Sequence, residues 1–221
     1  MSRNRYSISC IEIDAHQEIP ISNKFIKHKT PSNGLALIFP GLRYTCDMPL
    51  LYFSTGLLLE MGCDVLQLWI DPDAPDFERI SQAELTQQLL EYSKALLIAG
   101  KNGGAYSDLI LVGKSLGTLT MTLLLTNEQA FLNETTIWFT PLLNLPPVSQ
   151  IILSLSGPTF VVGGGADPTF EQEAVSQIKS MPNTTISVLE DANHSLEIPG
   201  DPIRSLQILS QVMTDLAGFT S

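Results

Sequence analysis

The sequence predicts an α/β protein built on a mostly parallel, doubly wound β-sheet. Six short apolar runs recur between residues 35 and 189, and short unbroken apolar runs are typical of parallel strands that are covered on both faces. Segments with helical spacing separate these runs, and strands that alternate with helices require crossover connections. Two earlier segments alternate apolar and polar residues, which is the pattern of half-buried strands.

The expected elements follow one another in a regular order. The two alternating segments, residues 6–14 and 21–29, are expected to form an opening antiparallel pair. The core strands are expected at residues 35–39, 65–70, 109–112, 136–139, 159–162 and 186–189. Helices are expected at residues 49–61, 80–99, 116–125, 170–180 and 202–217. A short helix at residues 145–155 is also expected, because Pro146 and Pro147 suit its first turn.

Length and composition indicate a single globular domain. The chain has 221 residues, of which 44% are hydrophobic and 16% charged, whereas disordered chains are poor in apolar residues and rich in unbalanced charge. The formal net charge of −11 repels phosphate backbones and anionic lipid surfaces. We therefore expect no nucleic-acid partner and no membrane partner. The oligomeric state cannot be read from the sequence.

Cysteine usage indicates a reducing compartment. The three cysteines, Cys10, Cys46 and Cys63, form no metal-binding cluster, and their odd number argues against a full disulfide framework. Glu12 and Asp14 interrupt the N-terminal region, which therefore lacks the apolar core of a signal peptide. We expect a cytoplasmic protein.

One five-residue motif carries the main chemical signal. Residues 113–117 read G-x-S-x-G and lie directly after one expected strand and directly before one expected helix, which is the context of a nucleophile elbow. The glycines permit a sharp turn that exposes the Ser115 hydroxyl, and the helix start directs the free N–H of Leu116 toward an oxygen held beside it. Ser115 is the candidate nucleophile and Leu116 a candidate oxyanion donor. The alternative is that Ser115 only caps the helix.

The tripeptide Gly113-Lys114-Ser115 also resembles the end of a phosphate-binding P-loop. That loop needs a glycine at position 108, where this chain has Asp108, and it needs a loop between the strand and the lysine. The phosphate-binding alternative therefore fails. Lys114 is expected to extend into solvent rather than to bind a ligand.

A serine nucleophile needs a general base, and His194 is the best candidate. It follows the last core strand, and reaction sites of open α/β sheets gather at the carboxyl ends of the strands. His16 and His28 lie in the opening strand pair, where a surface or strand-pairing role is expected.

The base needs an acid that orients it, and Asp167 occupies the expected place. It follows the expected strand at residues 159–162 and a glycine-rich turn, between Ser115 and His194 in chain order. Asp167 could also cap the helix that follows Pro168. Asp191 is the rival acid, although its place fits a role in loop structure better.

The second oxyanion donor should come from the loop after the first core strand. This loop begins Pro40-Gly41-Leu42, and the Leu42 N–H is the candidate donor. The alternative is an ordinary Pro-Gly turn.

Together these segments resemble the α/β-hydrolase superfamily, in particular compact lidless members related to dienelactone hydrolases and small esterases. The resemblance spans nearly the whole chain and rests on the elbow, on the order Ser115, Asp167, His194, and on endings similar to the family's Gly-x-x-Asp and Asp-His-Ser-Leu signatures. It implies that Ser115 is the nucleophile, His194 the base and acid, Asp167 the orienting acid, and that the Leu42 and Leu116 amides form the oxyanion hole.

Two positions depart from the family pattern. The family often has His-Gly where this chain has Pro40-Gly41, and Asp-His where this chain has Asn193-His194. A dienelactone hydrolase would typically use a cysteine nucleophile, so that specific activity is disfavoured here.

The predicted function is therefore a serine hydrolase that acts on a carboxylic ester or thioester of a small soluble substrate through an acyl-enzyme, with no metal or organic cofactor. A catalytically silent binding protein with the same fold is the alternative, because fold alone does not establish function. The short segment between the strands at residues 136–139 and 159–162 leaves no room for a large cap domain. Arg43, Tyr44 and Trp69 are candidates to line the pocket, and Arg43 could instead be an ordinary surface residue.

Overall fold

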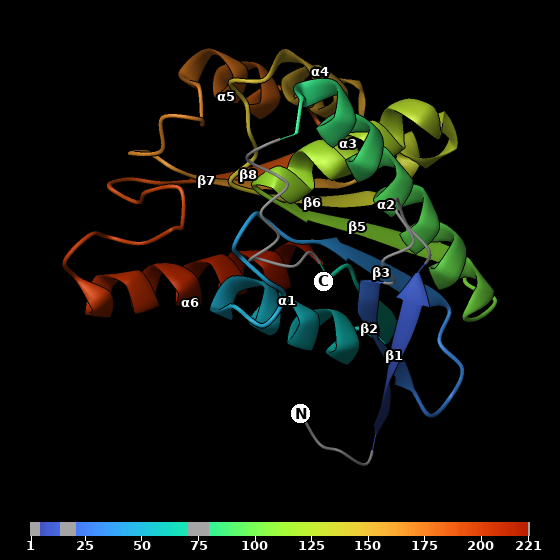
Figure 1. Cartoon of the computed structure of the whole chain (residues 1–221). Helices are drawn as coiled ribbons and strands as arrows, with labels where there is room; N and C mark the ends of the chain where they lie inside the picture. The colour runs from blue at the N-terminus through green and yellow to red at the C-terminus, as the bar shows by residue number, and fades with distance from the viewer. Residues whose placement is uncertain (1–4, 14–20, 70–79, 221) are drawn as a thin grey trace.

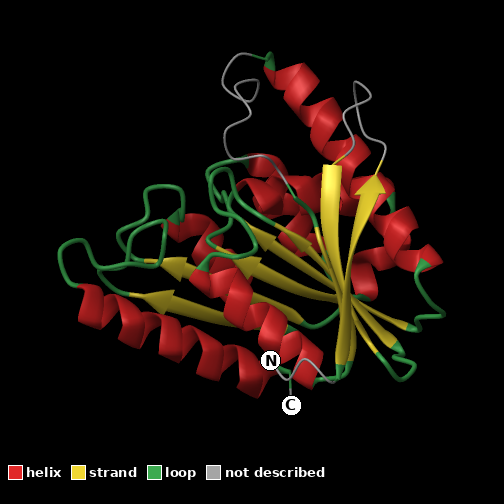
Figure 2. Ribbon diagram, turned by 60° about the horizontal axis from the view of Figure 1, so that its bottom comes forward, coloured by secondary structure: helices red, strands yellow, loops and turns green. Residues whose placement is uncertain are grey.

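The computed structural model describes residues 5–13, 21–69 and 80–220. Within them, eight strands form one sheet in the order β1-β2-β4-β3-β5-β6-β7-β8. The sheet twists so that β1 and β2 stand steeply across the other strands (Figure 2). The strands are β1 (Tyr6–Ile13), β2 (Ile21–His28), β3 (Gly34–Phe39), β4 (Cys63–Gln67), β5 (Asp108–Lys114), β6 (Thr135–Phe139), β7 (Thr159–Gly164) and β8 (Thr184–Leu189).

Strand pairing confirms the expected fold class. β1 pairs with β2 and β2 with β4 in antiparallel orientation, whereas every later pairing in the described sheet is parallel. β3 and β5 lie at the centre, with Ile38 opposite Val112 and Phe39 opposite Gly113. All six residues of β3 are buried, as expected for a strand covered on both faces.

Helices cover both faces of the sheet (Figure 1). α1 and α6 lie on one face, and α2 to α5 lie on the other. The helices are α1 (Pro49–Glu60), α2 (Gln82–Asn102), α3 (Leu116–Asn127), α4 (Pro146–Ser154), α5 (Gln172–Lys179) and α6 (Pro202–Phe219), with a 3-10 turn at Gln129–Asn133. None of the helices described here has the length and apolar character needed to cross a membrane.

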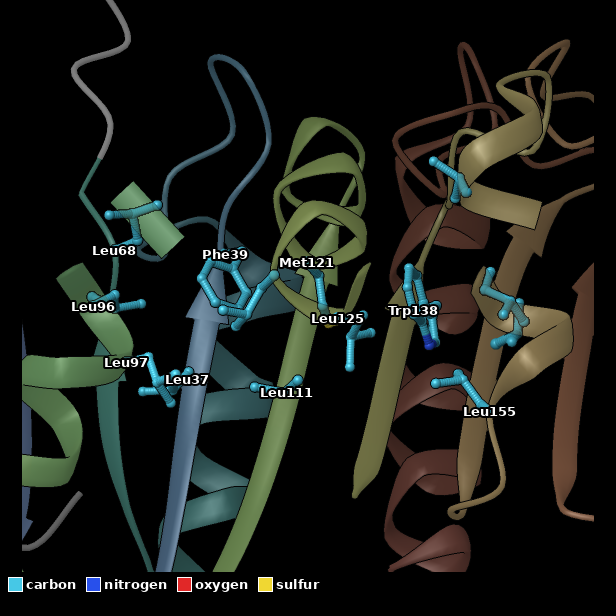
Figure 3. Packing of buried hydrophobic residues seen from close by; sticks show 14 of the residues in the cluster. Leu37, Phe39, Leu68, Leu96, Leu97, Leu111, Met121, Leu125, Trp138 and Leu155 are labelled. Carbon is cyan, nitrogen blue, oxygen red and sulfur yellow. The ribbon is translucent and has the colours of Figure 1, made fainter. Parts of the chain in front are cut away.

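An apolar cluster on each face holds the helices to the sheet. On the face of α2 to α5, Leu37 of β3 packs in one cluster with Met121 of α3 (Figure 3). On the opposite face, Ile38 of β3 packs in a second cluster with Leu58 of α1 and Val212 of α6. Leu37 and Ile38 belong to different clusters because successive side chains of a strand point to opposite faces.

Several boundaries differ from the expected ones for local reasons. The strand expected at residues 65–70 begins at Cys63 and ends at Gln67, and Ile70 lies outside the described residues. The helix expected from residue 80 begins after Ser81, which forms a capping box with Glu84. The helix expected from residue 170 begins at Gln172, and the Phe170 ring that precedes it packs against Gly163 of β7.

The connection between β6 and β7 matches the expectation of a compact molecule. It contains α4, which begins at Pro146 as predicted, and short loops. No cap domain is inserted in this described segment.

Candidate active site

Ser115 lies in a sharp turn between β5 and α3. Its backbone has φ 52 and ψ −117, a conformation that costs free energy in a non-glycine residue and persists only where neighbouring structure enforces it. The Ser115 N–H donates to the Phe139 carbonyl at 3.1 Å, which ties the turn to the end of β6. The Ser115 hydroxyl makes no capping hydrogen bond to α3, so the helix-cap alternative is wrong.

Glycines allow the backbone to pack closely around this turn. A Cβ atom on Gly117 would overlap the Phe39 carbonyl, and one on Gly113 would lie 2.9 Å from the Gly117 carbonyl. A Cβ atom on Gly41 would lie 3.2 Å from the Cβ atom of Ser115. The glycines of the motif therefore bring α3 against the sheet, and Gly41 brings the loop after β3 beside Ser115.

The structure brings Ser115, His194 and Asp167 together. His194 Nε2 lies 2.7 Å from Ser115 Oγ, and His194 Nδ1 lies 2.7 Å from Asp167 Oδ2. An ionised carboxylate can only accept, so Nδ1 carries the proton in the neutral ring and Nε2 is free to accept from the Ser115 hydroxyl. The His194 side chain is 34% exposed and the Asp167 side chain is 0% exposed, so the carboxylate is shielded while the ring edge is open to a substrate.

Thr169 completes the surroundings of the buried carboxylate. Its N–H and hydroxyl donate to Asp167 Oδ1 at 2.9 Å and 2.8 Å. Burial raises the pKa of the Asp167 carboxyl, but hydrogen bonds from His194 and Thr169 outweigh it, and the pKa lies below the ordinary value. Asp167 therefore stays ionised at neutral pH. It does not cap α5, since the N-cap of that helix is Glu171.

The other candidate acids and bases lie elsewhere. Asp191 is exposed and pairs with Arg204 at 3.4 Å. His28 lies at the opposite edge of the sheet, where Nδ1 is 3.0 Å from Asp64 Oδ1 and Nε2 is 3.0 Å from the Leu59 carbonyl. These contacts tie His28 to β4 and α1, where a surface or strand-pairing role was expected, whereas His16 lies outside the described residues.

The two candidate oxyanion donors flank Ser115. Leu116 is the first residue of α3, and the first N–H groups of a helix have no partner within it. Leu42 follows Gly41 in a tight turn that is closed by a 3.3 Å hydrogen bond from the Tyr44 N–H to the Gly41 carbonyl. Neither amide donates to another residue in the described part of the chain. Both are thus available to an oxygen of a bound substrate.

Lys114 corrects the sequence prediction, because it is buried rather than solvent-exposed. Only 2% of its surface is accessible. Its Nζ donates to Thr140 Oγ1 at 2.7 Å and to the His194 carbonyl at 2.9 Å, and it lies 4.9 Å from the centroid of the Tyr44 ring. Burial lowers the pKa of this ammonium to about 8, against the opposing effect of the carboxylates of Asp167 and Glu197.

A cavity of about 500 Å³ is lined by Tyr44 and by Ser195, the neighbour of His194, but not by Ser115, Asp167 or His194 themselves. Tyr44 forms one wall, and its hydroxyl accepts a hydrogen bond from the Leu50 N–H at 3.2 Å. The segment that follows His194 forms another wall, and the start of α6 forms a third. The remaining apolar lining comes mainly from Met48, Pro49, Leu196, Ile198, Leu206 and Leu209, and two carboxylates, Glu197 and Asp201, also border it.

The pocket-lining predictions were correct only in part. Tyr44 lines the cavity, whereas Arg43 and Trp69 do not. Arg43 is exposed and has a positive φ of 56. The Trp69 backbone N–H donates to Asn23 Oδ1 at 2.9 Å.

Three residues of the site were missed from the sequence. Thr169 lies two positions after Asp167, and a hydroxyl at this spacing can bond back to an aspartate side chain. Lys114 lies two residues after Val112, so the two side chains point to the same face of β5. Val112 packs under α1 and α6 on that face, and the alternation along the strand could therefore have predicted that Lys114 is buried. Thr140 has no comparable signal, because its contact with Lys114 joins β5 to the residue that follows β6. In the described part of the chain, no cluster of three or more His, Cys, Asp or Glu residues is arranged to hold a metal ion.

Several solved structures have a similar fold. Est1E from Butyrivibrio proteoclasticus with ferulic acid bound is 16% identical, with a TM-score of 0.66 over 94% of this chain and 99% of that one. A dienelactone hydrolase from Anabaena variabilis is 13% identical, with a TM-score of 0.69 over 97% of both chains. An esterase from Pyrococcus furiosus is 15% identical, with a TM-score of 0.66 over 97% of this chain and 91% of its own. No protein-family model matches the sequence, and no curated protein matches it.

Proposed function

We propose that this chain, which has the α/β-hydrolase fold, is a serine hydrolase that cleaves a carboxylic ester or thioester of a small soluble substrate. The observation that carries the proposal is the unbroken hydrogen-bond chain from Ser115 Oγ through both nitrogens of His194 to Asp167. This series of hydrogen bonds has the geometry that activates a serine hydroxyl as a nucleophile. The solved neighbours named above include an esterase and a dienelactone hydrolase, which supports hydrolysis as the reaction class.

The first half of the proposed reaction forms an acyl-enzyme. His194 Nε2 accepts the Ser115 proton while Oγ attacks the substrate carbonyl carbon. The Leu42 and Leu116 amides donate to the oxyanion of the tetrahedral intermediate. His194 then returns the proton to the leaving alcohol or thiol, and the acyl group remains on Ser115.

The second half releases the acyl group. His194 takes a proton from a water molecule, whose oxygen attacks the acyl carbon, and the proton then passes to Ser115 Oγ as the carboxylic acid leaves. In both halves the imidazolium is stabilised by the ionised carboxylate of Asp167, whose lowered pKa keeps it charged.

The cavity beside the site favours a neutral, apolar substituent on the substrate. Its lining is largely apolar, and its volume of about 500 Å³ lies within the range of small-molecule pockets. The carboxylates of Glu197 and Asp201 at its border would repel an anionic group. We propose that one side of the ester enters this cavity past Tyr44.

Labelling with a fluorophosphonate tests the proposed nucleophile. The native protein should form one covalent adduct, and mass spectrometry should place it on Ser115. Ser115→Ala should abolish the adduct, and Ser176→Ala, which removes an exposed hydroxyl of α5, should leave it unchanged. The absence of an adduct on the native protein, or an adduct that survives Ser115→Ala, would instead support a catalytically silent binding protein.

A further inference from the structure

Lys114 is a buried titratable group that the proposed reaction does not use. It is the last residue of β5 and immediately precedes Ser115. A buried ammonium is destabilising unless every N–H finds a partner. Here the partners are one hydroxyl, one carbonyl and the face of one aromatic ring, so all three N–H directions are accounted for.

The carbonyl that Lys114 binds belongs to His194 itself. Nζ approaches this oxygen to 2.9 Å, while the His194 ring approaches Ser115 Oγ to 2.7 Å. Lys114 thus binds the backbone of His194, and the next residue, Ser115, contacts its side chain. A hydrogen bond from a charged donor is about twice as strong as a neutral one.

Apolar packing also holds the turn that carries His194, because Leu196 lies in one cluster with Ile38 of β3 and Val112 of β5. Within the turn, the Asn193 side chain accepts from the Ser195 and Glu197 N–H groups at 2.8 Å and 3.0 Å, and backbone hydrogen bonds join Asn193 to Leu196 and Glu197. The Ala166 N–H donates to the Ala192 carbonyl at 3.0 Å and links the turn to the loop of Asp167. The contact from Lys114 links it to β5, the strand that ends at the elbow.

Thr140 fixes the other end of the ammonium. It has an unusual positive φ of 41, and its N–H donates to the Val162 carbonyl at 2.7 Å. Its hydroxyl accepts from Lys114 Nζ. The ammonium is therefore held between the end of β6 and the turn that follows β8.

We infer that Lys114 is a positioning residue, which fixes the backbone of His194 so that Nε2 stays in line with Ser115 Oγ. This inference rests on the proposed function, because it assigns a task that matters only if His194 acts as the base. A displacement of a catalytic group by about 1 Å can reduce the rate by about 100-fold. The ammonium thus supports catalysis through His194 without contacting the substrate.

The charge environment predicts how this role depends on pH. The groups that face the ammonium are the carboxylates of Asp167 and Glu197, the Tyr44 ring and His194. Since burial lowers the pKa of Lys114 to about 8, the charge is present below that pH and is lost above it. Neutral amine hydrogen bonds are weaker, so kcat/KM should fall as the pH rises past about 8.

Lys114→Met and Lys114→Arg test the inference. Met keeps the length and removes every donor, so kcat and the rate of fluorophosphonate labelling should fall about tenfold or more, while KM changes little. Lys114→Arg keeps a cationic donor whose charge is retained to high pH. It should recover part of the rate and remove the fall above about pH 8. Circular dichroism and the melting temperature check that each variant is folded.

Thr140→Val and Thr140→Ser provide a second test that does not depend on how well Lys114→Met folds. Val removes the acceptor of the ammonium and should slow labelling, whereas Ser keeps the hydroxyl and should label at the native rate. Native labelling rates and an unchanged pH profile in both Lys114→Met and Thr140→Val would overturn the inference. If the native protein forms no adduct on Ser115, the proposed function fails instead.

Discussion

The Asp167 carboxylate lies in contact with Nδ1 of His194 at 2.7 Å, and its own side chain is completely shielded from solvent. Thr169 occupies the other carboxylate oxygen with two hydrogen bonds. A charge that is buried and fully partnered keeps a fixed orientation, so the ring of His194 is held in a single tautomer.

Asp167→Asn should nearly abolish hydrolysis while leaving the fold intact. An amide of the same shape can present an N–H to His194 Nδ1, which favours the tautomer whose Nε2 cannot accept the Ser115 proton. In the corresponding change of a serine protease triad, kcat falls about 10⁴-fold, and a loss of similar order is expected here. Ester hydrolysis measured at saturating substrate checks this. Activity near the native level would show that Asp167 does not orient His194.

Acid should destabilise the native protein more than the Asp167→Asn variant. The pKa of Asp167 in the folded protein lies below its ordinary value of 3.8, so the ionised form stabilises the fold above that pH. This contribution is lost as the pH falls through the lowered pKa. Urea unfolding at a series of pH values down to about 3 should show the free energies of the two proteins converging. If the free energies of unfolding of the two proteins changed in parallel with pH, the lowered pKa would not belong to Asp167.

Gly117→Ala should disrupt the packing of α3 against the sheet. The added Cβ atom would overlap backbone atoms of Phe39 and Pro40, which cannot move aside as a flexible side chain can. The free energy of unfolding should fall by about 3 kcal/mol or more, and labelling of Ser115 should decrease. Gly218→Ala is the matched control, because a Cβ atom there meets no neighbour within 4 Å, and it should be neutral or slightly stabilising.

Leu206→Trp should change the preference for the apolar group of the substrate. Leu206 borders the cavity at the start of α6, and a larger ring there would occupy its volume. Activity toward esters with long apolar chains should therefore drop more than activity toward acetyl esters. Ile98→Trp adds the same ring to an exposed position on α2 and should leave the ratio unchanged. An unaltered ratio in Leu206→Trp would exclude the cavity as a substrate site.

Residues that are marked by a local sequence motif, or by their place directly after a core strand, could be predicted from the sequence. The elbow around Ser115 is specified by glycines at fixed positions and by the strand and helix that flank it. Asp167 and His194 could be placed because each follows a core strand, and the carboxyl ends of parallel strands meet at one edge. The opening strands were visible through the alternation of their residue types, although Ser7, Ile8, Ser9 and Cys10 of β1 are all exposed.

The burial of Lys114 and the lining of the cavity were not found, because they depend on contacts between distant segments that no local pattern marks. Lys114 is a charged residue beside a functional motif, and solvent exposure is the usual state of a lysine. Its burial depends on Thr140, Tyr44 and His194, which come from three other segments. The cavity likewise forms only where the loop after β3, the turn after β8 and the start of α6 meet.

The separation of the site residues along the chain affects when the site can form during folding. Ser115 and His194 are 79 residues apart, and the loop that joins them must close before their contact yields any free energy. β8 pairs with β7 at the edge of the sheet, and His194 follows β8. Reactivity of Ser115 in a refolding experiment would therefore report the docking of this last strand and not the earlier collapse of the central sheet.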